Sequence, residues 1–343
     1  MSKVTLQDIA GVCDVDISTV SRALRNDSRV TNASRDRIHD AAKRLGYRPN
    51  LLARNLAGGS TKTLWFILPS LDALVDYRLV RHASHYANTR DYALFAAMHD
   101  CDTFTPPLSK SLTHYSELVE RAGQGLADGT IILPRRFYSD LPLLKDLVLH
   151  NFPLVFIDNY VESLPVPVVT TDNHAAAHEL AKRCVQAGAR EAILLFEEQN
   201  SVAKARLTGA QTALRELGVP FVNLKQVPAD WTPEKLGSSV AILGSAQHYL
   251  HHIIVRYAEH LSGKHLIFGV FDDWQGEPSP ATCVIIAVQD YETMTQRAVN
   301  NLIAQIEKKT QESPRMDLIP VREFKTLCSS FYPSAVRSTI PCH

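Results

Sequence analysis

The first sixty residues place apolar positions at the spacing of short α-helices. Thr5 can cap a first helix, Asp16 a second over residues 18–26, and Thr31 a third that ends at Gly46. Two helices joined by a short turn and braced by a third form a helix-turn-helix unit, whose second helix enters the major groove of DNA. The pattern therefore predicts an all-α DNA-binding head. A three-helix surface module without a DNA role is the alternative.

From residue 62 onward the pattern changes to continuous apolar runs that alternate with amphipathic stretches. This alternation indicates parallel sheets wound on both faces by helices. So long a body is too large for one sheet and predicts two lobes, with ligands in the crevice at the carboxyl ends of the strands. The runs are LWFILPSL (64–71), ALFAAM (93–98), GTIILP (129–134), PLVFID (153–158), PVPVVTTD (165–172), EAILLF (191–196), VAILG (240–244), LIFGVFDD (266–273) and CVIIAV (283–288).

The formal net charge is zero, but its distribution along the chain is uneven. Residues 1–60 carry a net charge of +4 and the remainder carries −4, so the head is modestly basic and suits attraction to phosphate. At the start of the second helix, Ile17, Ser18 and Arg22 are predicted to reach base edges, with Arg22 suited to guanine. The other predicted DNA contacts, to phosphate or within turns, are Thr5, Thr19, Ser21, Asn26, Arg29 and Asn32.

Motifs for nucleotide, hydrolase and metal chemistry are missing or incomplete. There is no GxGxxG, GxxxxGK[ST] or GxSxG segment, and the two histidines of HAAAHE (174–179) are expected on a solvated helix face. The six cysteines form no CxxC pair and are expected to be reduced thiols. The N-terminus lacks a secretion signal, and no apolar run reaches the roughly 20 residues that span a bilayer. We therefore expect a cytoplasmic protein that is not an enzyme and uses no metal, cofactor or membrane.

The segments TLQDIA, DISTVSRAL and RDRIHDAAKRLGYRPNLLARNL resemble the N-terminal head of the lac repressor (LacI/GalR) family over residues 4–56. The resemblance implies that the segment after YRPN is a hinge helix that orders only on DNA. Two such helices would pair in the minor groove, and each would wedge Leu56 into the central base step. The turn departs from the family, because Cys13 and Asp14 replace its usual Ala-Gly. The residues that the resemblance assigns to the hinge contacts are Asn50, Ala53, Arg54 and Leu56.

The body resembles the same family more loosely and implies a periplasmic-binding-protein-like, two-lobed effector domain that dimerises. Arg206 matches the arginine that binds effector oxygens there, and Trp231 matches the tryptophan that stacks on the effector. Carboxylates, a guanidinium, an amide and aromatic faces suit a polyhydroxylated ligand, although each residue alone also fits a cap or a surface ion pair. The implied effector residues are Asp72, Tyr77, Asp158, Arg206, Trp231, Asp272, Gln289 and Tyr291.

The expected organisation is a head at 1–48, a hinge helix and linker at 49–61, and a body at 62–343. The first lobe is expected at about 62–160 and 290–320, and the second at about 161–289 and 321–340. The resemblance implies a transcriptional repressor that binds a near-palindromic operator as a homodimer and is controlled allosterically by a sugar or sugar phosphate. A sugar-binding protein without DNA activity is the alternative. The segment TPEKLGSS (232–239) is shorter than the family's usual helix, which predicts a trimmed second lobe.

Overall fold

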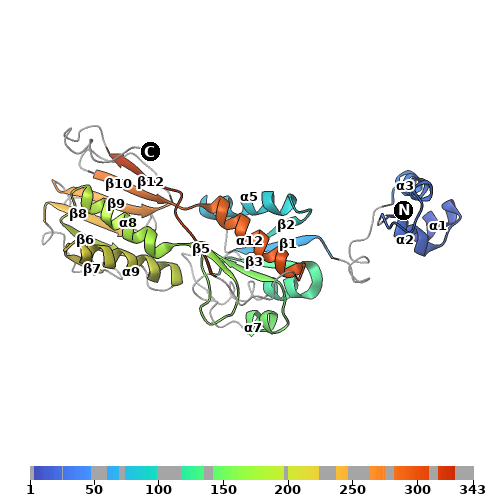
Figure 1. Ribbon diagram of the computed structural model, residues 1–343, viewed down its shortest axis with the longest axis horizontal. Helices are drawn as coiled ribbons and strands as arrows, with labels where there is room; N and C mark the ends of the chain where they lie inside the picture. The colour runs from blue at the N-terminus through green and yellow to red at the C-terminus, as the bar shows by residue number, and fades with distance from the viewer. Residues whose placement is uncertain are drawn as a thin grey trace. The chain divides into compact units, whose positions relative to one another are not determined.

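The computed structural model describes most of the chain, in segments. The chain divides into two compact units, residues 1–61 and residues 62–343 (Figure 1). The predicted hinge contacts Asn50, Ala53, Arg54 and Leu56 lie outside the described residues, as do Asp72 and Trp231. The described residues are 4–24, 26–47, 60–68, 74–98, 117–134, 142–196, 200–223, 237–245, 263–272, 274, 282–308 and 316–328.

The N-terminal unit contains the three predicted helices, α1 (Leu6–Cys13), α2 (Ile17–Leu24) and α3 (Asn32–Leu45). Each contributes its apolar face to one small core, in which Ile9, Val20 and Ile38 are fully buried. The helical spacing read from the sequence therefore gave the correct elements and the correct inward faces.

Local polar contacts fix where these helices begin. The Thr5 hydroxyl accepts a hydrogen bond from the backbone N–H of Asp8, while the Asp8 carboxylate accepts one from the Thr5 N–H at 2.7 Å. Thr31 caps α3 in the same way through the Ser34 N–H. The expected side-chain cap at Asp16 is wrong, because its side chain bonds to no described residue; its carbonyl instead accepts from the Val20 N–H at 3.1 Å.

The turn between α1 and α2 depends on one residue with a left-handed backbone. Asp14 has φ 51° and ψ 53°, and its N–H donates to the Ala10 carbonyl and so ends α1. Aspartate tolerates this region better than most side chains because its short polar group bonds locally. The Asp14 substitution is therefore compatible with the helix-turn-helix.

The first lobe is a parallel sheet with strand order β11-β5-β4-β3-β1-β2. Helices α5 and α12 cover one face, and α7 and the short π-helix η1 lie on the opposite face (Figure 1). Both faces of the central strands are buried, which explains their continuous apolar sequences. The elements are β1 (Thr63–Leu68), α5 (Leu74–Asn88), β2 (Ala93–Met98), η1 (Ala122–Leu126), β3 (Gly129–Ile132), α7 (Pro142–Leu149), β4 (Leu154–Ile157), β5 (Val168–Thr171), α12 (Tyr291–Ile306) and β11 (Met316–Ile319).

The second lobe has strand order β12-β10-β9-β8-β6-β7, and α8 and α9 pack together on one face (Figure 1). Its strands are parallel except β12, which pairs antiparallel with β10. Because β10 ends where the chain leaves this lobe and β12 begins where it returns, the two must run in opposite directions. The elements are β6 (Glu191–Leu195), α8 (Asn173–Gln186), α9 (Ser201–Glu216), β7 (Phe221–Asn223), β8 (Ser239–Gly244), β9 (His265–Phe271), β10 (Thr282–Val288) and β12 (Glu323–Cys328).

The chain crosses between the lobes three times, near residues 172, 289 and 321. The expected lobe boundary at about residue 160 is wrong, because β5 pairs with β4 and β11 and so belongs to the first sheet. The first lobe extends to Thr171, and the carboxyl ends of β5 and β10 both lie at the crossings.

The structure also bears on two expectations about side-chain chemistry, for the cysteines and for the HAAAHE histidines. Cys283 is disulfide-bonded, so the expectation of reduced thiols is wrong for this residue, which lies opposite Cys328 in the β10–β12 register. His178 of HAAAHE bonds to the Glu216 carboxylate at 2.8 Å. Across the described segments, no group of three or more His, Cys, Asp or Glu side chains could hold a metal, and no helix there is long and apolar enough to cross a membrane.

Candidate functional site

The exposed face of α2 carries the residues predicted to read DNA bases. Ile17 is 45% exposed and Ser18 is exposed, whereas Val20 and Ala23 point into the core. Arg22 is half-buried and lies one helical turn from Ser18, so the two share a face. A hydroxyl and a guanidinium on one helix face can both bond to base edges, which is the chemistry that the sequence interpretation requires of α2.

The predicted phosphate contacts are less uniform. Arg29 forms an ion pair with Asp27, with 2.6 Å between Nη2 and Oδ2, and its hydrogen bonds lower the Asp27 pKa. Thr19 and Ser21 are half-buried, and Asn32 is an exposed first residue of α3. Asn26 has φ 57° and forms the turn after α2. DNA phosphates would therefore compete with Asp27 for Arg29.

Some basic residues of the head serve its own structure. The Arg37 guanidinium donates to the Cys13 carbonyl at 3.1 Å, and Arg35 donates to the Val30 carbonyl at 3.1 Å. Both arginines donate to backbone carbonyls where a helix ends or a turn begins. The positive charge of the head therefore overstates the number of arginines available for phosphate contacts.

In the body, Arg206 is a buried guanidinium beside the crossings. It is 4% exposed, its Nε donates to the Asn173 side-chain oxygen at 2.7 Å, and its Cζ lies 3.6 Å from the centre of the Phe271 ring. Asn173 in turn donates to the Thr171 carbonyl at 2.9 Å. The arginine on α9 is thereby fixed to the start of α8 and the end of β5.

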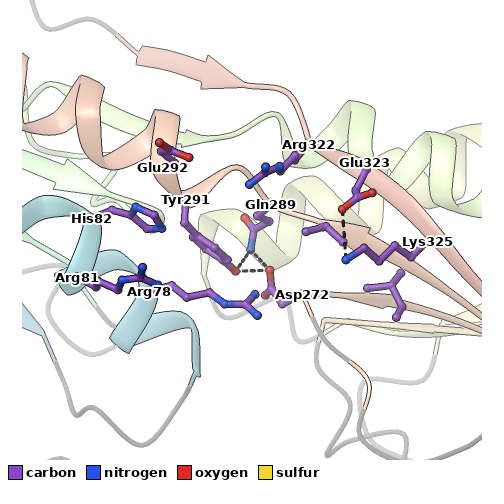
Figure 2. Close-up of a pocket in the computed structure, with 12 residues that line it drawn as sticks. Arg78, Arg81, His82, Asp272, Gln289, Tyr291, Glu292, Arg322, Glu323 and Lys325 are labelled. Carbon is purple, nitrogen blue, oxygen red and sulfur yellow. Dashed lines mark hydrogen bonds and ion pairs between the residues drawn. The ribbon is translucent and has the colours of Figure 1, made fainter. Parts of the chain in front are cut away.

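Asp272, Gln289 and Tyr291 form a hydrogen-bonded group across the lobes (Figure 2). The Gln289 amide donates to Asp272 Oδ1 at 2.8 Å, and the Tyr291 hydroxyl donates to the same oxygen. The Gln289 carbonyl oxygen accepts from the Thr171 hydroxyl. Because Thr171 and Tyr291 belong to the first lobe and Asp272 to the second, these bonds join the lobes at the carboxyl ends of their strands.

Burial dominates the electrostatics of this group. It raises the Asp272 pKa, against the Arg206 charge and the bonds from Tyr291 and Gln289. It lowers the Arg206 pKa, against the attraction of Asp272 and Asp158. Burial and the Asp272 charge raise the Tyr291 pKa well above its ordinary value. A ligand that supplied polar partners here would meet groups that the fold has already removed from water, where hydrogen bonds are electrostatically stronger.

The structure brings five of the predicted effector residues together: Asp158, Arg206, Asp272, Gln289 and Tyr291. Asp158 and Asp272 both have positive φ, 63° and 74°, at the ends of β4 and β9. The family resemblance implies that Tyr77 lies in a first-lobe loop that closes the site, but Tyr77 lies on α5 and is 53% exposed.

The sequence interpretation did not single out Thr171, Asn173 or Phe271. The rule that ligands lie at the carboxyl ends of parallel strands could have found Thr171 and Asn173, because they flank the end of PVPVVTTD. No motif identifies Phe271 as the ring beneath the arginine.

A cavity of about 420 Å³, here called the hinge cavity, opens beside this group (Figure 2). It lies between α5 and the start of α12 on one side and β9, β10 and β12 on the other. Its lining residues are Arg78, Arg81, His82, Asp272, Ile286, Val288, Gln289, Tyr291, Glu292, Arg322, Glu323 and Lys325.

Known proteins resemble both the head and the body of the chain. Residues 5–50 match the family model "Bacterial regulatory proteins, lacI family". The chain is 27% identical over 218 residues to the HTH-type transcriptional regulator RegA of Clostridium saccharobutylicum, covering 63% of this chain and 62% of RegA. The aligned region therefore spans about three fifths of that relative.

Solved structures show the same fold at low sequence identity. The lac repressor dimer bound to operator and the anti-inducer ONPF superimposes with a TM-score of 0.70 at 18% identity, covering 95% of this chain and 98% of that one. The transcriptional regulator CelR in complex with cellobiose gives 0.60 at 17% identity, covering 95% and 98%. Residues 5–50 therefore match the lacI family of bacterial regulatory proteins, and the body beyond them has the fold seen in the lac repressor and in CelR.

Proposed function

We propose that the protein is a transcriptional repressor that binds a near-palindromic operator as a homodimer and responds to a small carbohydrate ligand. The observation that carries the proposal is the lacI-family match over residues 5–50, together with the exposure of Ile17 and Ser18 beside Arg22 on α2. The proposed role of Leu56 and the hinge helix rests only on the resemblance of residues 49–56 to the hinge sequence of the lac repressor family.

The ligand is proposed to bind where the lobes meet. Arg206, Asp272 and Gln289 offer donors and acceptors in pairs, and Phe271 and Tyr291 offer rings, which together suit a molecule with several hydroxyl groups. A ligand that takes over the bonds between Tyr291, Gln289 and Asp272 interacts differently with open and closed lobes. Such unequal binding is the requirement for coupling the crevice to DNA affinity. CelR in complex with cellobiose offers a precedent on this fold.

Dimerisation is proposed through the exposed edge of the first sheet. Strand β2 is the apolar sequence ALFAAM, yet Phe95 is 57% exposed and Met98 is 41% exposed. An exposed apolar edge strand promotes aggregation unless another surface covers it. A second copy of the chain is the occupant that a palindromic operator requires.

The DNA-reading role of α2 is tested with Arg22→Ala. Loss of a bidentate contact to a base costs about 1–3 kcal/mol, so affinity for the preferred sequence should fall roughly tenfold to a hundredfold. The duplex is selected by the protein from a random-sequence pool, and binding is measured by fluorescence anisotropy on this duplex and on a scrambled one.

Arg44→Ala is the control for the Arg22 experiment. Arg44 is exposed on α3, so its loss removes the same charge without removing a group from α2. It should weaken both duplexes slightly and equally, whereas Arg22→Ala should weaken mainly the selected one. Equal losses from the two variants on both duplexes would show that Arg22 does not read sequence, and absence of any selected duplex would refute the proposed function.

The dimer surface is tested with Phe95→Lys, which places a charge on the β2 edge. We expect the dimer to dissociate at micromolar concentrations, as measured by analytical ultracentrifugation. The control is Val222→Lys on β7, an equally apolar edge residue of the second sheet that is 51% exposed. A dimer that survives Phe95→Lys as well as it survives Val222→Lys places the interface elsewhere.

A further inference from the structure

We propose that the hinge cavity holds the phosphate group of the ligand, so that the effector is a phosphorylated polyhydroxylated molecule rather than a neutral sugar. The proposal rests on the proposed function and specifies the ligand class of the same site. It depends on which charges around the cavity already have partners and which do not.

Three arginines that line the cavity have unused guanidinium groups. Arg78 and Arg81 come from α5 in the first lobe, and Arg322 precedes β12 in the second. Within the described part of the chain, none of these guanidinium groups forms a hydrogen bond or an ion pair. In Figure 2 the Arg78 side chain extends toward Asp272, whose pKa its charge helps to lower.

The carboxylates around the same cavity are already engaged. Glu323 pairs with Lys325 at 3.2 Å, and Glu292 accepts from the Tyr86 hydroxyl at 3.2 Å. Asp272 accepts from both Gln289 and Tyr291. The lining therefore carries four permanent positive charges, those of Arg78, Arg81, Arg322 and Lys325, against the three carboxylates of Asp272, Glu292 and Glu323. Lys325 pairs with Glu323, and Arg78 acts on Asp272 through its charge, so the guanidinium groups retain donors for an anionic ligand.

The chemistry of that surface favours phosphate over a hydroxyl group. Guanidinium forks present parallel N–H donors that match two oxygens of a phosphate, and a phosphate monoester carries close to two negative charges at neutral pH. Because α5 and the start of β12 lie in different lobes, one phosphate between them would be bound by both. Its affinity then depends on how far the lobes are closed.

The position of the cavity connects it to the ligand site. Asp272, Gln289 and Tyr291 line the hinge cavity and also form the hydrogen-bonded group described above, and the charge of Asp272 attracts Arg206. A volume of about 420 Å³ lies within the usual range of small-ligand sites. Because Arg81, Arg322, Asp272 and Gln289 line the same cavity, we expect a ligand whose phosphate contacts the arginines to direct its hydroxyl groups toward Asp272 and Gln289.

The test is isothermal titration calorimetry on the full-length protein with inorganic phosphate, a set of hexose and pentose phosphates, and the corresponding neutral sugars. We expect a phosphorylated probe to bind at least tenfold more tightly than its neutral parent. Arg81→Ala and Arg322→Ala should each weaken that binding about tenfold or more, because each removes a charge-assisted contact. Lys145→Ala removes an exposed charge on α7, away from the cavity, and should change nothing.

The outcomes separate this inference from the proposed function. Equal binding of a sugar and its phosphate, no binding of any phosphorylated probe up to about 10 mM, or binding that both arginine variants retain overturns the phosphate site. The arginines are then a solvated surface. Recognition of the selected DNA duplex is measured on the same variants and should persist in all of them. Loss of DNA recognition by the unmodified chain would refute the repressor function and leave a measured phosphate site intact.

Discussion

Arg206→Ala should eliminate the response to ligand while DNA binding remains. The guanidinium is buried, bonded to Asn173 and stacked on Phe271, so no neighbouring side chain can replace it. Removing one member of a buried, hydrogen-bonded charge arrangement costs about 2–5 kcal/mol of binding, which is roughly thirtyfold to several thousandfold in affinity. The measurement is release of the protein from its selected duplex by the sugar or sugar phosphate that is most effective on the unmodified chain.

Arg183→Ala is the matched control for this experiment. Arg183 also stacks on a ring, with its Cζ 4.5 Å from the centre of Phe324, and also bonds to a side chain, Glu179, at 2.8 Å. Arg183 is not among the charges that act on Asp272, whereas Arg206 is, so ligand-induced release should be unchanged. A normal response in Arg206→Ala, with both variants folded by circular dichroism, would show that the crevice residues are assigned incorrectly.

Gly209→Ala should destabilise the body strongly. A Cβ at this position would lie 2.1 Å from the His174 carbonyl oxygen, an atom of the α8 backbone that cannot rotate away. The better helix propensity of alanine returns about 1 kcal/mol, whereas forcing two packed helices apart costs about 3 kcal/mol or more. We expect a net loss of about 2 kcal/mol or more in the free energy of unfolding, measured by urea denaturation.

The same substitution should also weaken ligand binding, because the α8–α9 contact sets the distance between Asn173 and Arg206. Thr208→Ala, at the exposed neighbouring position of α9, should stay within about 0.5 kcal/mol of the unmodified chain. Equal stabilities of the two variants would mean that α8 and α9 approach less closely than the structure indicates.

Much of the fold follows from apolar spacing. The three helices of the head and the nine strand-forming runs of the body all match observed elements. The strands that the pattern did not reveal are β7, β11 and β12. Each lies at a sheet edge, where one side is exposed and the apolar signal is weak; β11 has the exposed residues Met316 and Leu318. The antiparallel direction of β12 depends on where the chain re-enters the lobe, which no local pattern contains.

The candidate site was only partly predictable for a different reason. Arg206, Asp272, Gln289 and Tyr291 stand in recognisable segments, so their sequence context identified them before their contacts were known. Arg78, Arg81 and Arg322 stand in ordinary charged stretches, and only their tertiary placement brings them to one cavity. Whether a charge is already paired, as for Glu323 and Lys325, is likewise a property of the packed molecule.

The three chain crossings have a mechanical consequence. Thr171 comes just before the first crossing, Gln289 lies in the second, and Arg322 lies in the third, so all three tethers end within or beside the group that surrounds Asp272. A molecule held there sits close to the axis about which the lobes would rotate. A movement of about an ångström near this axis produces a displacement several times larger at the far end of a lobe. A small ligand at the crossings can therefore cause a large movement of the lobes.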